Sequence, residues 1–119
     1  MTTALPTVIL REVTPSEAEF ERRVLALARS LGYLAFHPHS SKHSESGFPD
    51  LTLLRESDGR LVLAELKVWP RLTLRPMQQR WLTAATKNPQ LEYYVWRWVW
   101  PGDIEQQIAT ILARDAIDG

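Results

Sequence analysis

The chain has 119 residues, a length typical of one domain whose hydrophobic core needs no disulfide or structural metal. It contains no cysteine, which excludes disulfides and thiolate metal sites, and its 14 basic residues balance 14 acidic ones. No stretch approaches the ~20 apolar residues of a membrane-spanning helix, and the first residues do not read as a secretory signal. We therefore expect a single domain over residues 1–119 that is cytoplasmic and has no membrane partner.

A first helix is predicted after an N-terminal arm, residues 1–13, in which Val8 to Leu10 belong either to the arm or to an extra strand. Thr14 is the expected N-cap, because proline follows at the first helical position and Glu17 stands three residues after the cap. Apolar residues then recur at helical spacing until a glycine ends the helix: Phe20, Val24, Leu27, Leu31 and Gly32.

Three strands are predicted next. Residues 33–36 form a short strand, and the apolar run that follows Asp50 forms a second. Residues 57–59, Ser-Asp-Gly, read as a tight turn that leads into a returning strand over residues 61–67. The second and third strands therefore form a hairpin.

The last third of the chain predicts a helix, a strand and a helix. Pro76 suits the first position of a helix that ends near Lys87. Residues 92–100 read as a strand with four aromatic residues on one face, Tyr94, Trp96, Trp98 and Trp100. Isoleucines at helical spacing follow residues 101–103, Pro-Gly-Asp. The order helix, three strands, helix, strand, helix is typical of an α/β restriction-endonuclease-like core, a mixed sheet flanked by helices.

Three charged residues of the hairpin are candidates for a site. Asp50 opens one strand, and Glu65 and Lys67 project from one face of the other because strand side chains alternate. Charges on such apolar strands are costly unless they are paired or bind a cation. Each residue alone could be a turn residue or half of an exposed cross-strand pair. Together they indicate a metal-assisted hydrolytic site.

These residues carry a resemblance to a known family. The Asp50, Glu65 and Lys67 arrangement, with proline before the first acid, resembles the PD-(D/E)xK nuclease motif. More closely, GFPDLTL, LVLAELK and PMQQRWL in this order are similar to the virus-type replication-repair nuclease domain, VRR-NUC. The similarity extends from about Ser16 to Arg97, so the whole chain is expected to be one VRR-NUC-like nuclease domain.

The resemblance implies a role for each matching residue. Asp50, Glu65 and the main-chain carbonyl of Leu66 would bind Mg²⁺ or Mn²⁺, whose preferred ligands are oxygens. Lys67 would lie near the attacking water or the scissile phosphate. Gln78 matches the glutamine that follows the third strand in the family, where an amide could orient the water or hold a phosphate. An ordinary helix-surface glutamine is the alternative for Gln78.

Nucleases of this type usually add a glutamate from the first helix, and three are available. At ~100° per residue, Glu17 falls within the apolar face, Glu21 at its edge and Glu19 on the far side. Glu17 and the preceding serine match the start of the VRR-NUC helix, whereas Glu21 matches the spacing in archaeal Holliday-junction resolvases. We expect Glu17 to be the catalytic and metal-binding acid and keep Glu21 as the alternative.

The basic residues suggest where DNA would bind. Residues 67–90 contain no acidic residue, and arginine suits bidentate phosphate contact, although a solvated arginine-rich face is the alternative. The three histidines could instead form a zinc cluster, but their spacing across a proline and a serine-rich loop disfavours it. The expected DNA-binding residues are His37, Ser41, Lys42, Arg71, Arg75 and Arg80.

The predicted function is a metal-dependent endonuclease that hydrolyses DNA. Selection of branched DNA, a Holliday junction or a flap, in repair, recombination or replication is implied by the resemblance. A homodimer is expected because the tryptophans exceed what a small core needs. The alternatives are a restriction-like or general DNA nuclease of the same fold and a nucleic-acid-binding module without turnover.

Overall fold

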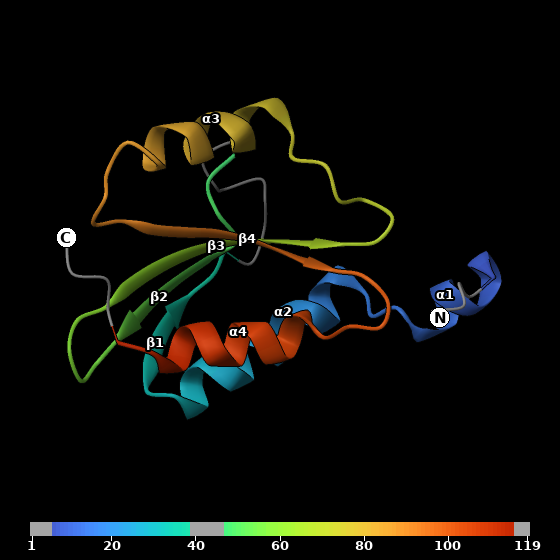
Figure 1. Cartoon of the computed structure of the whole chain (residues 1–119), viewed down its shortest axis with the longest axis horizontal. Coiled ribbons are helices and arrows are strands. Elements are labelled where there is room, and N and C mark those ends of the chain that lie inside the picture. Colours follow the sequence, from blue (N-terminus) through green and yellow to red (C-terminus); the bar gives the residue numbers. More distant parts are fainter. Residues whose placement is uncertain (1–5, 39–46, 116–119) are drawn as a thin grey trace.

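The computed structural model describes residues 6–38 and 47–115, which form three layers: two helices, a four-stranded sheet and one helix (Figure 1). The strand order is β1-β2-β3-β4, with the first two pairings antiparallel and the last parallel. The elements are α1 Thr7–Val13, α2 Glu17–Ser30, β1 Tyr33–Phe36, β2 Leu51–Arg55, β3 Leu61–Val68, α3 Pro76–Ala85, β4 Glu92–Trp98 and α4 Ile104–Ala113. This order and the mixed sheet confirm the expected fold class.

The core lies between the sheet and the helix pair α2 and α4. Cross-strand partners such as Leu53 and Val62 share this face of the sheet, and both are fully buried. Phe20 and Val24 of α2 and Ile108 of α4 belong to the same buried cluster. Among the described residues, α3 is the helix that covers the opposite face, above the sheet in Figure 1, so the two faces of β3 meet different surroundings.

The start of α2 differs from the sequence-based expectation. Ser16, and not Thr14, is the N-cap, and its hydroxyl accepts a hydrogen bond from the Glu19 main-chain nitrogen at 3.0 Å. Thr14 instead follows α1 and donates its hydroxyl to the Leu10 carbonyl. The capping box that Thr14 and Glu17 were expected to form is therefore wrong, because Ser16 offers the same hydroxyl two residues later. Glu17 has no capping role.

Two further expectations are corrected at the ends of elements. The possible strand at residues 8–10 is wrong, since these residues lie in α1, a helix without buried residues that projects from the domain (Figure 1). The fourth strand ends at Trp98, and Trp100 is 43% exposed. Trp96 and Trp98 lie in the core. Within the described residues, no helix combines the length and the apolarity that a membrane crossing requires.

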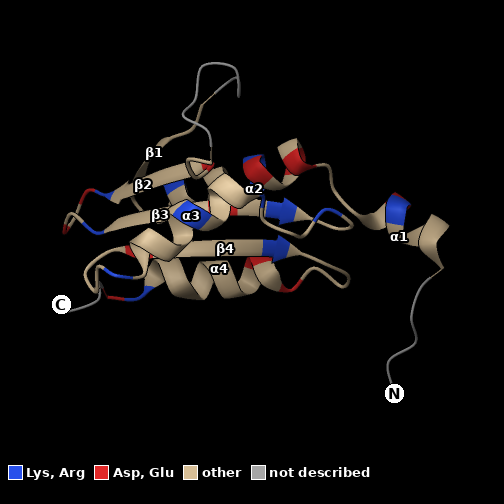
Figure 2. Ribbon diagram, turned by 90° about the horizontal axis from the view of Figure 1, so that it is seen from above, with Lys and Arg blue, Asp and Glu red and all other residues tan. Residues whose placement is uncertain are grey.

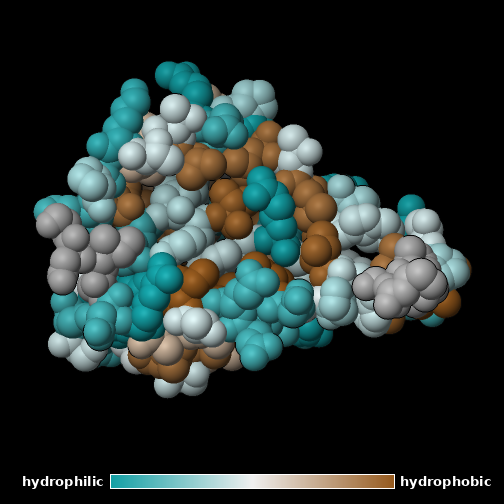
Figure 3. All heavy atoms as spheres, in the orientation of Figure 1, coloured by the Kyte–Doolittle hydropathy of each residue, from teal (hydrophilic) through white to brown (hydrophobic). Residues whose placement is uncertain are grey.

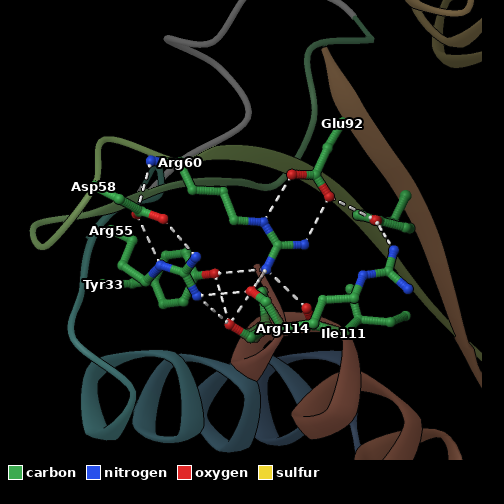
Figure 4. A network of polar contacts seen from close by, with 9 residues as sticks. Tyr33, Arg55, Asp58, Arg60, Glu92, Ile111 and Arg114 are labelled. Atoms are coloured by element: carbon green, nitrogen blue, oxygen red, sulfur yellow. Dashed lines mark hydrogen bonds and ion pairs between the residues drawn. The ribbon is translucent and has the colours of Figure 1, made fainter. Parts of the chain in front are cut away.

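A buried polar network joins the hairpin to the C-terminal end of α4 (Figure 4). Arg60 donates to both carboxylate oxygens of Glu92, each at 2.7 Å, and its third nitrogen donates to three carbonyls at the end of α4. Arg55 donates to two of the same carbonyls and pairs with Asp58. Cations at a helix C-terminus satisfy carbonyls that have no partner within the helix. The network therefore anchors α4 across the sheet.

Candidate active site

A turn that packs against α3 positions Asp50. Gly47 has a φ of +79°, and a Cβ on it would lie 2.5 Å from the main-chain carbon of Met77, so only glycine permits this approach. The ring of Phe48 meets that of Trp81 edge to face at a centroid distance of 5.2 Å. Pro49 is buried. The turn that packs against α3 therefore places Asp50 directly before β2.

The side chains of Glu65, Lys67 and Gln78 form one hydrogen-bonded chain beneath α3. The Gln78 amide nitrogen donates to Glu65 Oε1 at 2.9 Å, and Lys67 Nζ donates to Gln78 Oε1 at 2.9 Å. The main-chain nitrogen of Arg75 donates to the same Gln78 oxygen at 2.8 Å. All three side chains are buried, so neither the helix-surface alternative for Gln78 nor the exposed-pair alternative for Glu65 and Lys67 applies.

The carboxyl groups of Asp50 and Glu65 lie against each other. Burial and then the close approach of the Asp50 carboxyl group raise the pKa of Glu65 from 4.5 to about 9, while the charge of Lys67 opposes the rise. Asp50 Oδ2 also accepts the main-chain nitrogen of Leu66 at 2.8 Å. Glu65 Oε2 is buried and has no hydrogen-bond partner among the described residues. Two adjoining carboxyl groups with an unpartnered oxygen are stabilised by a shared proton or by a cation.

Both candidate glutamates of the first helix lie beside Asp50. A pocket of about 230 Å³ is lined by Glu17, Ala18 and Glu21 of α2 together with Asp50 and Leu66. The charge of Glu17 contributes to the raised pKa of Glu65. Glu21 is instead 3.4 Å from His37, measured from Oε1 to Nδ1. The structure thus brings both glutamates to the pocket, and the charge of Glu17 is among those that raise the pKa of Glu65.

The expected DNA-binding residues lie partly on the α3 side of the molecule. Arg71, Arg75 and Arg80 are exposed on α3 and on the loop that precedes it. Figure 2 shows basic segments on α3 and at the ends of β3 and β4. Ser41 and Lys42 lie outside the described residues, as do the other two histidines of the possible zinc cluster.

Tyr93 is a site neighbour that sequence reasoning missed. In the parallel pairing of β3 and β4, Tyr93 lies opposite Leu63, so its side chain shares a face with Glu65 and Lys67. Burial, followed by the charges of Glu65 and Asp50, raises the pKa of Tyr93 to about 12. The alternation within residues 92–98 separates Tyr93 from Tyr94, but only the register with β3 shows which of them faces the site.

The sequence matches no family model and no curated protein. Among solved structures, the fold is similar to one described as a VRR_NUC domain, with a TM-score of 0.61 and 20% sequence identity. The match covers 81% of this chain and 92% of the other. The resemblance that GFPDLTL, LVLAELK and PMQQRWL indicated thus extends to the arrangement of the elements that carry them. The chain has the fold of a VRR_NUC domain.

Proposed function

We propose that this protein is a metal-dependent endonuclease of the PD-(D/E)xK type that hydrolyses DNA phosphodiester bonds. One observation carries the proposal: the half-buried carboxyl group of Asp50 adjoins the buried carboxyl group of Glu65 beside Lys67, which Gln78 holds in place. Titratable groups perturbed by burial and by each other are typical of catalytic sites. The similarity to a VRR_NUC domain supports this reading, because it places the chain in the fold that its GFPDLTL, LVLAELK and PMQQRWL segments led us to expect.

The residues present fit a divalent cation. Asp50 and Glu65 supply carboxylate oxygens, including the buried and unpartnered Glu65 Oε2, and Leu66 lines the same pocket as Asp50. Mg²⁺ and Mn²⁺ prefer such ligands, and Mg²⁺ keeps several waters, so two carboxylates and the Leu66 carbonyl suffice. Within the described part of the chain, no three histidine, cysteine, aspartate or glutamate side chains group as a metal site. Glu17 remains a proposed further ligand from the pocket wall.

The surrounding residues of the chain would orient the reaction. When bound, Mg²⁺ or Mn²⁺ supplies a polarised water and stabilises charge on phosphoryl oxygens. Lys67 places a positive charge beside the carboxyl pair, where it would stabilise the charge that develops on the phosphate. Gln78 receives hydrogen bonds from Lys67 and from the Arg75 main chain, and it donates to Glu65. The amide therefore keeps the base of the site rigid, and we assign it this orienting role.

DNA would bind along the side of the domain that carries α3. Arg71, Arg75 and Arg80 expose their guanidinium groups there without acidic neighbours in the sequence, and arginine forms bidentate phosphate contacts. His37 lies beside Glu21 at the pocket and is a further proposed contact. We keep Ser41 and Lys42 as proposed contacts on sequence grounds. Branched DNA, processed in repair, recombination or replication in the cytoplasm, is the proposed substrate.

A homodimer is part of the same proposal. α3 covers only part of its face of the sheet among the described residues. On the uncovered part of that face, Leu34, Leu54 and Leu61 lie opposite one another on adjacent strands, and each is at least 40% exposed. Phe36, two residues along the edge strand β1, is 64% exposed. Hydrophobic side chains also gather on the surface between α3 and the lower helices in Figure 3. A second copy of the chain would bury these leucines, and a concentration-independent monomer mass in sedimentation would exclude it.

Cleavage assays with defined DNA structures test the function. Labelled duplex, single strand, flap and four-way junction are incubated with Mg²⁺ or Mn²⁺, and Asp50→Ala and Lys67→Ala are compared with the parent protein. We expect cutting by the parent, strongest on the flap or junction, and its loss in both variants. Asp103→Ala and Lys87→Ala remove the same charges from exposed positions and serve as matched controls.

The outcomes separate the alternatives. Binding of DNA without cleavage by the parent would support a nucleic-acid-binding module in place of an enzyme. Equal cleavage of plain duplex and four-way junction would favour a general or restriction-like nuclease. Cleavage that survives both Asp50→Ala and Lys67→Ala would refute the assignment of the site.

A further inference from the structure

The active-site face of the sheet holds two buried polar atoms that lack a hydrogen-bond partner among the described residues. One is Oε2 of Glu65 and the other is the hydroxyl of Tyr93. Nearly all buried polar groups in folded proteins bind another polar group or an ordered water. Two unpartnered atoms on one face of a small sheet therefore point to a common ligand.

The register of β3 and β4 makes a common ligand geometrically reasonable. Glu65 pairs with Val95 and Tyr93 with Leu63, so Tyr93 and Glu65 are diagonal neighbours on adjacent strands and on one face. Diagonal neighbours are within reach of an aromatic side chain. The two atoms are also complementary, because a phenol hydroxyl donates a hydrogen bond and a carboxylate oxygen accepts one.

We propose that Tyr93 is a positioning residue whose hydroxyl, with Glu65 Oε2, holds an ordered water that orients the Glu65 carboxylate for a divalent cation. This inference rests on the proposed metal site. Gln78 already fixes the other oxygen, Oε1, at 2.9 Å. The carboxyl group would thus be held at both ends, by an amide on one side and by the Tyr93 water on the other, and the second lone pair of Oε2 would remain for the cation. Groups that hold a metal ligand in this way change metal affinity without contacting the metal.

The neighbouring tyrosine supplies a matched control. Tyr94 points to the opposite face of β4, where its hydroxyl donates to Glu92 at 2.7 Å and accepts from Arg114 at 2.9 Å. Tyr93→Phe and Tyr94→Phe each remove one hydroxyl from adjacent positions of the same strand. The first removes an unpartnered hydroxyl and the second removes one with two partners. The two substitutions should therefore differ in their effects on stability and on metal binding.

The test measures Mn²⁺ affinity by calorimetry, thermal unfolding without metal, and cleavage kinetics. For Tyr93→Phe we expect about 10-fold or more weaker Mn²⁺ binding, from the range for such outer contacts. We also expect a lower kcat with an unchanged KM for DNA, and an unchanged or higher Tm. For Tyr94→Phe we expect a lower Tm and the parent affinity for Mn²⁺.

An Mn²⁺ affinity of Tyr93→Phe equal to that of the parent would overturn the inference, whatever its Tm. Equal weakening of Mn²⁺ binding by both substitutions would also overturn it, because the effect would then be general loosening of β4. A parent protein that binds Mn²⁺ but cuts no DNA would reject the nuclease function, while the two affinities would still decide the role of Tyr93.

Discussion

Two clusters of buried charge in this domain differ in how completely their polar atoms are hydrogen-bonded. Around Arg60, the guanidinium reaches both oxygens of Glu92 and the end of α4. Around Glu65, one carboxylate oxygen and the Tyr93 hydroxyl lack partners among the described residues. The hydrogen bond from Arg60 lowers the pKa of Glu92, whereas burial and Asp50 raise that of Glu65 to about 9.

This contrast distinguishes a stabilising cluster from the proposed active site. Both glutamates are buried on the sheet, at 5% exposure for Glu92 and 2% for Glu65, so burial alone does not distinguish them. What differs is the partner, a dedicated cation in one cluster and a second carboxyl group in the other. Sites that bind ligands keep such unfavourable arrangements because the ligand relieves them. Substitutions that act on one cluster and spare the other test this separation.

The largest expected effect on stability comes from Arg60→Met. It leaves the Glu92 carboxylate buried without its cation, and breaking a buried pair in this way costs about 3–5 kcal/mol. Urea denaturation measures the lost free energy of unfolding. The double variant with Glu92→Met is the control, and it should regain part of the loss because no unpaired charge remains. A single variant within about 1 kcal/mol of the parent would contradict the stabilising role.

Glu65→Gln should do the opposite of Arg60→Met: it should reduce cleavage and leave stability unchanged. It removes a proposed metal ligand, so we expect a loss of cleavage on the order of 1000-fold, equivalent to several kcal/mol of transition-state stabilisation. Stability without metal should stay constant or rise, since the amide is uncharged and burial disfavours the ionised form of Glu65, as its raised pKa shows. Glu92→Gln is the matched control, expected to lose stability and keep cleavage. Loss of stability in both variants, or loss of cleavage in both, would contradict the separate roles of the two clusters.

A substitution in the turn before Asp50 should have a smaller effect on stability. In Gly47→Ala the Cβ would lie 2.5 Å from the Met77 main chain, so α3 must shift, at a cost of about 2–3 kcal/mol. Gly59→Ala is the control, because Gly59 has a similar φ of +75° but open space around its Cβ, and we expect about 1 kcal/mol. Thermal unfolding of both variants measures the difference. Equal losses would show that α3 does not hold the turn.

Per pH unit, the pH dependence of stability without metal is the smallest expected effect. With the pKa of Glu65 raised from 4.5 to about 9, the folded protein binds a proton that the unfolded chain has released. This contribution is complete below pH 4.5 and is lost as the pH rises towards 9, with a slope of at most about 1.4 kcal/mol per pH unit. Glu92, with its lowered pKa, contributes in the opposite direction and loses its effect in acid.

Thermal unfolding in EDTA between pH 5.5 and 9 measures this slope. The parent should lose stability relative to Glu65→Gln as the pH rises, because the amide does not titrate. Parallel profiles of the two proteins would mean that Glu65 is already ionised in the folded state.

Much of the site was predictable from short-range patterns. The hairpin, the common face of Glu65 and Lys67 and the helix that begins at Pro76 follow from strand alternation, turn residues and proline position. The N-cap of the first long helix was not predictable in this way, because Thr14 and Ser16 both offer a hydroxyl group. Only the path of the chain decides between them. The burial of Gln78 beside Glu65 also depends on how α3 packs on the sheet.

The sequence by itself predicted which residues would carry the chemistry, and it determined their order along the chain and the face of each strand on which they project. Periodicity is a property of one element, so it needs no knowledge of the others. Only the tertiary structure decided that Tyr93 faces Glu65, that Arg60 meets Glu92 and that one cluster is fully hydrogen-bonded while the other is not. Burial and pairing depend on elements that are distant in the chain and meet only when the sheet and its helices pack.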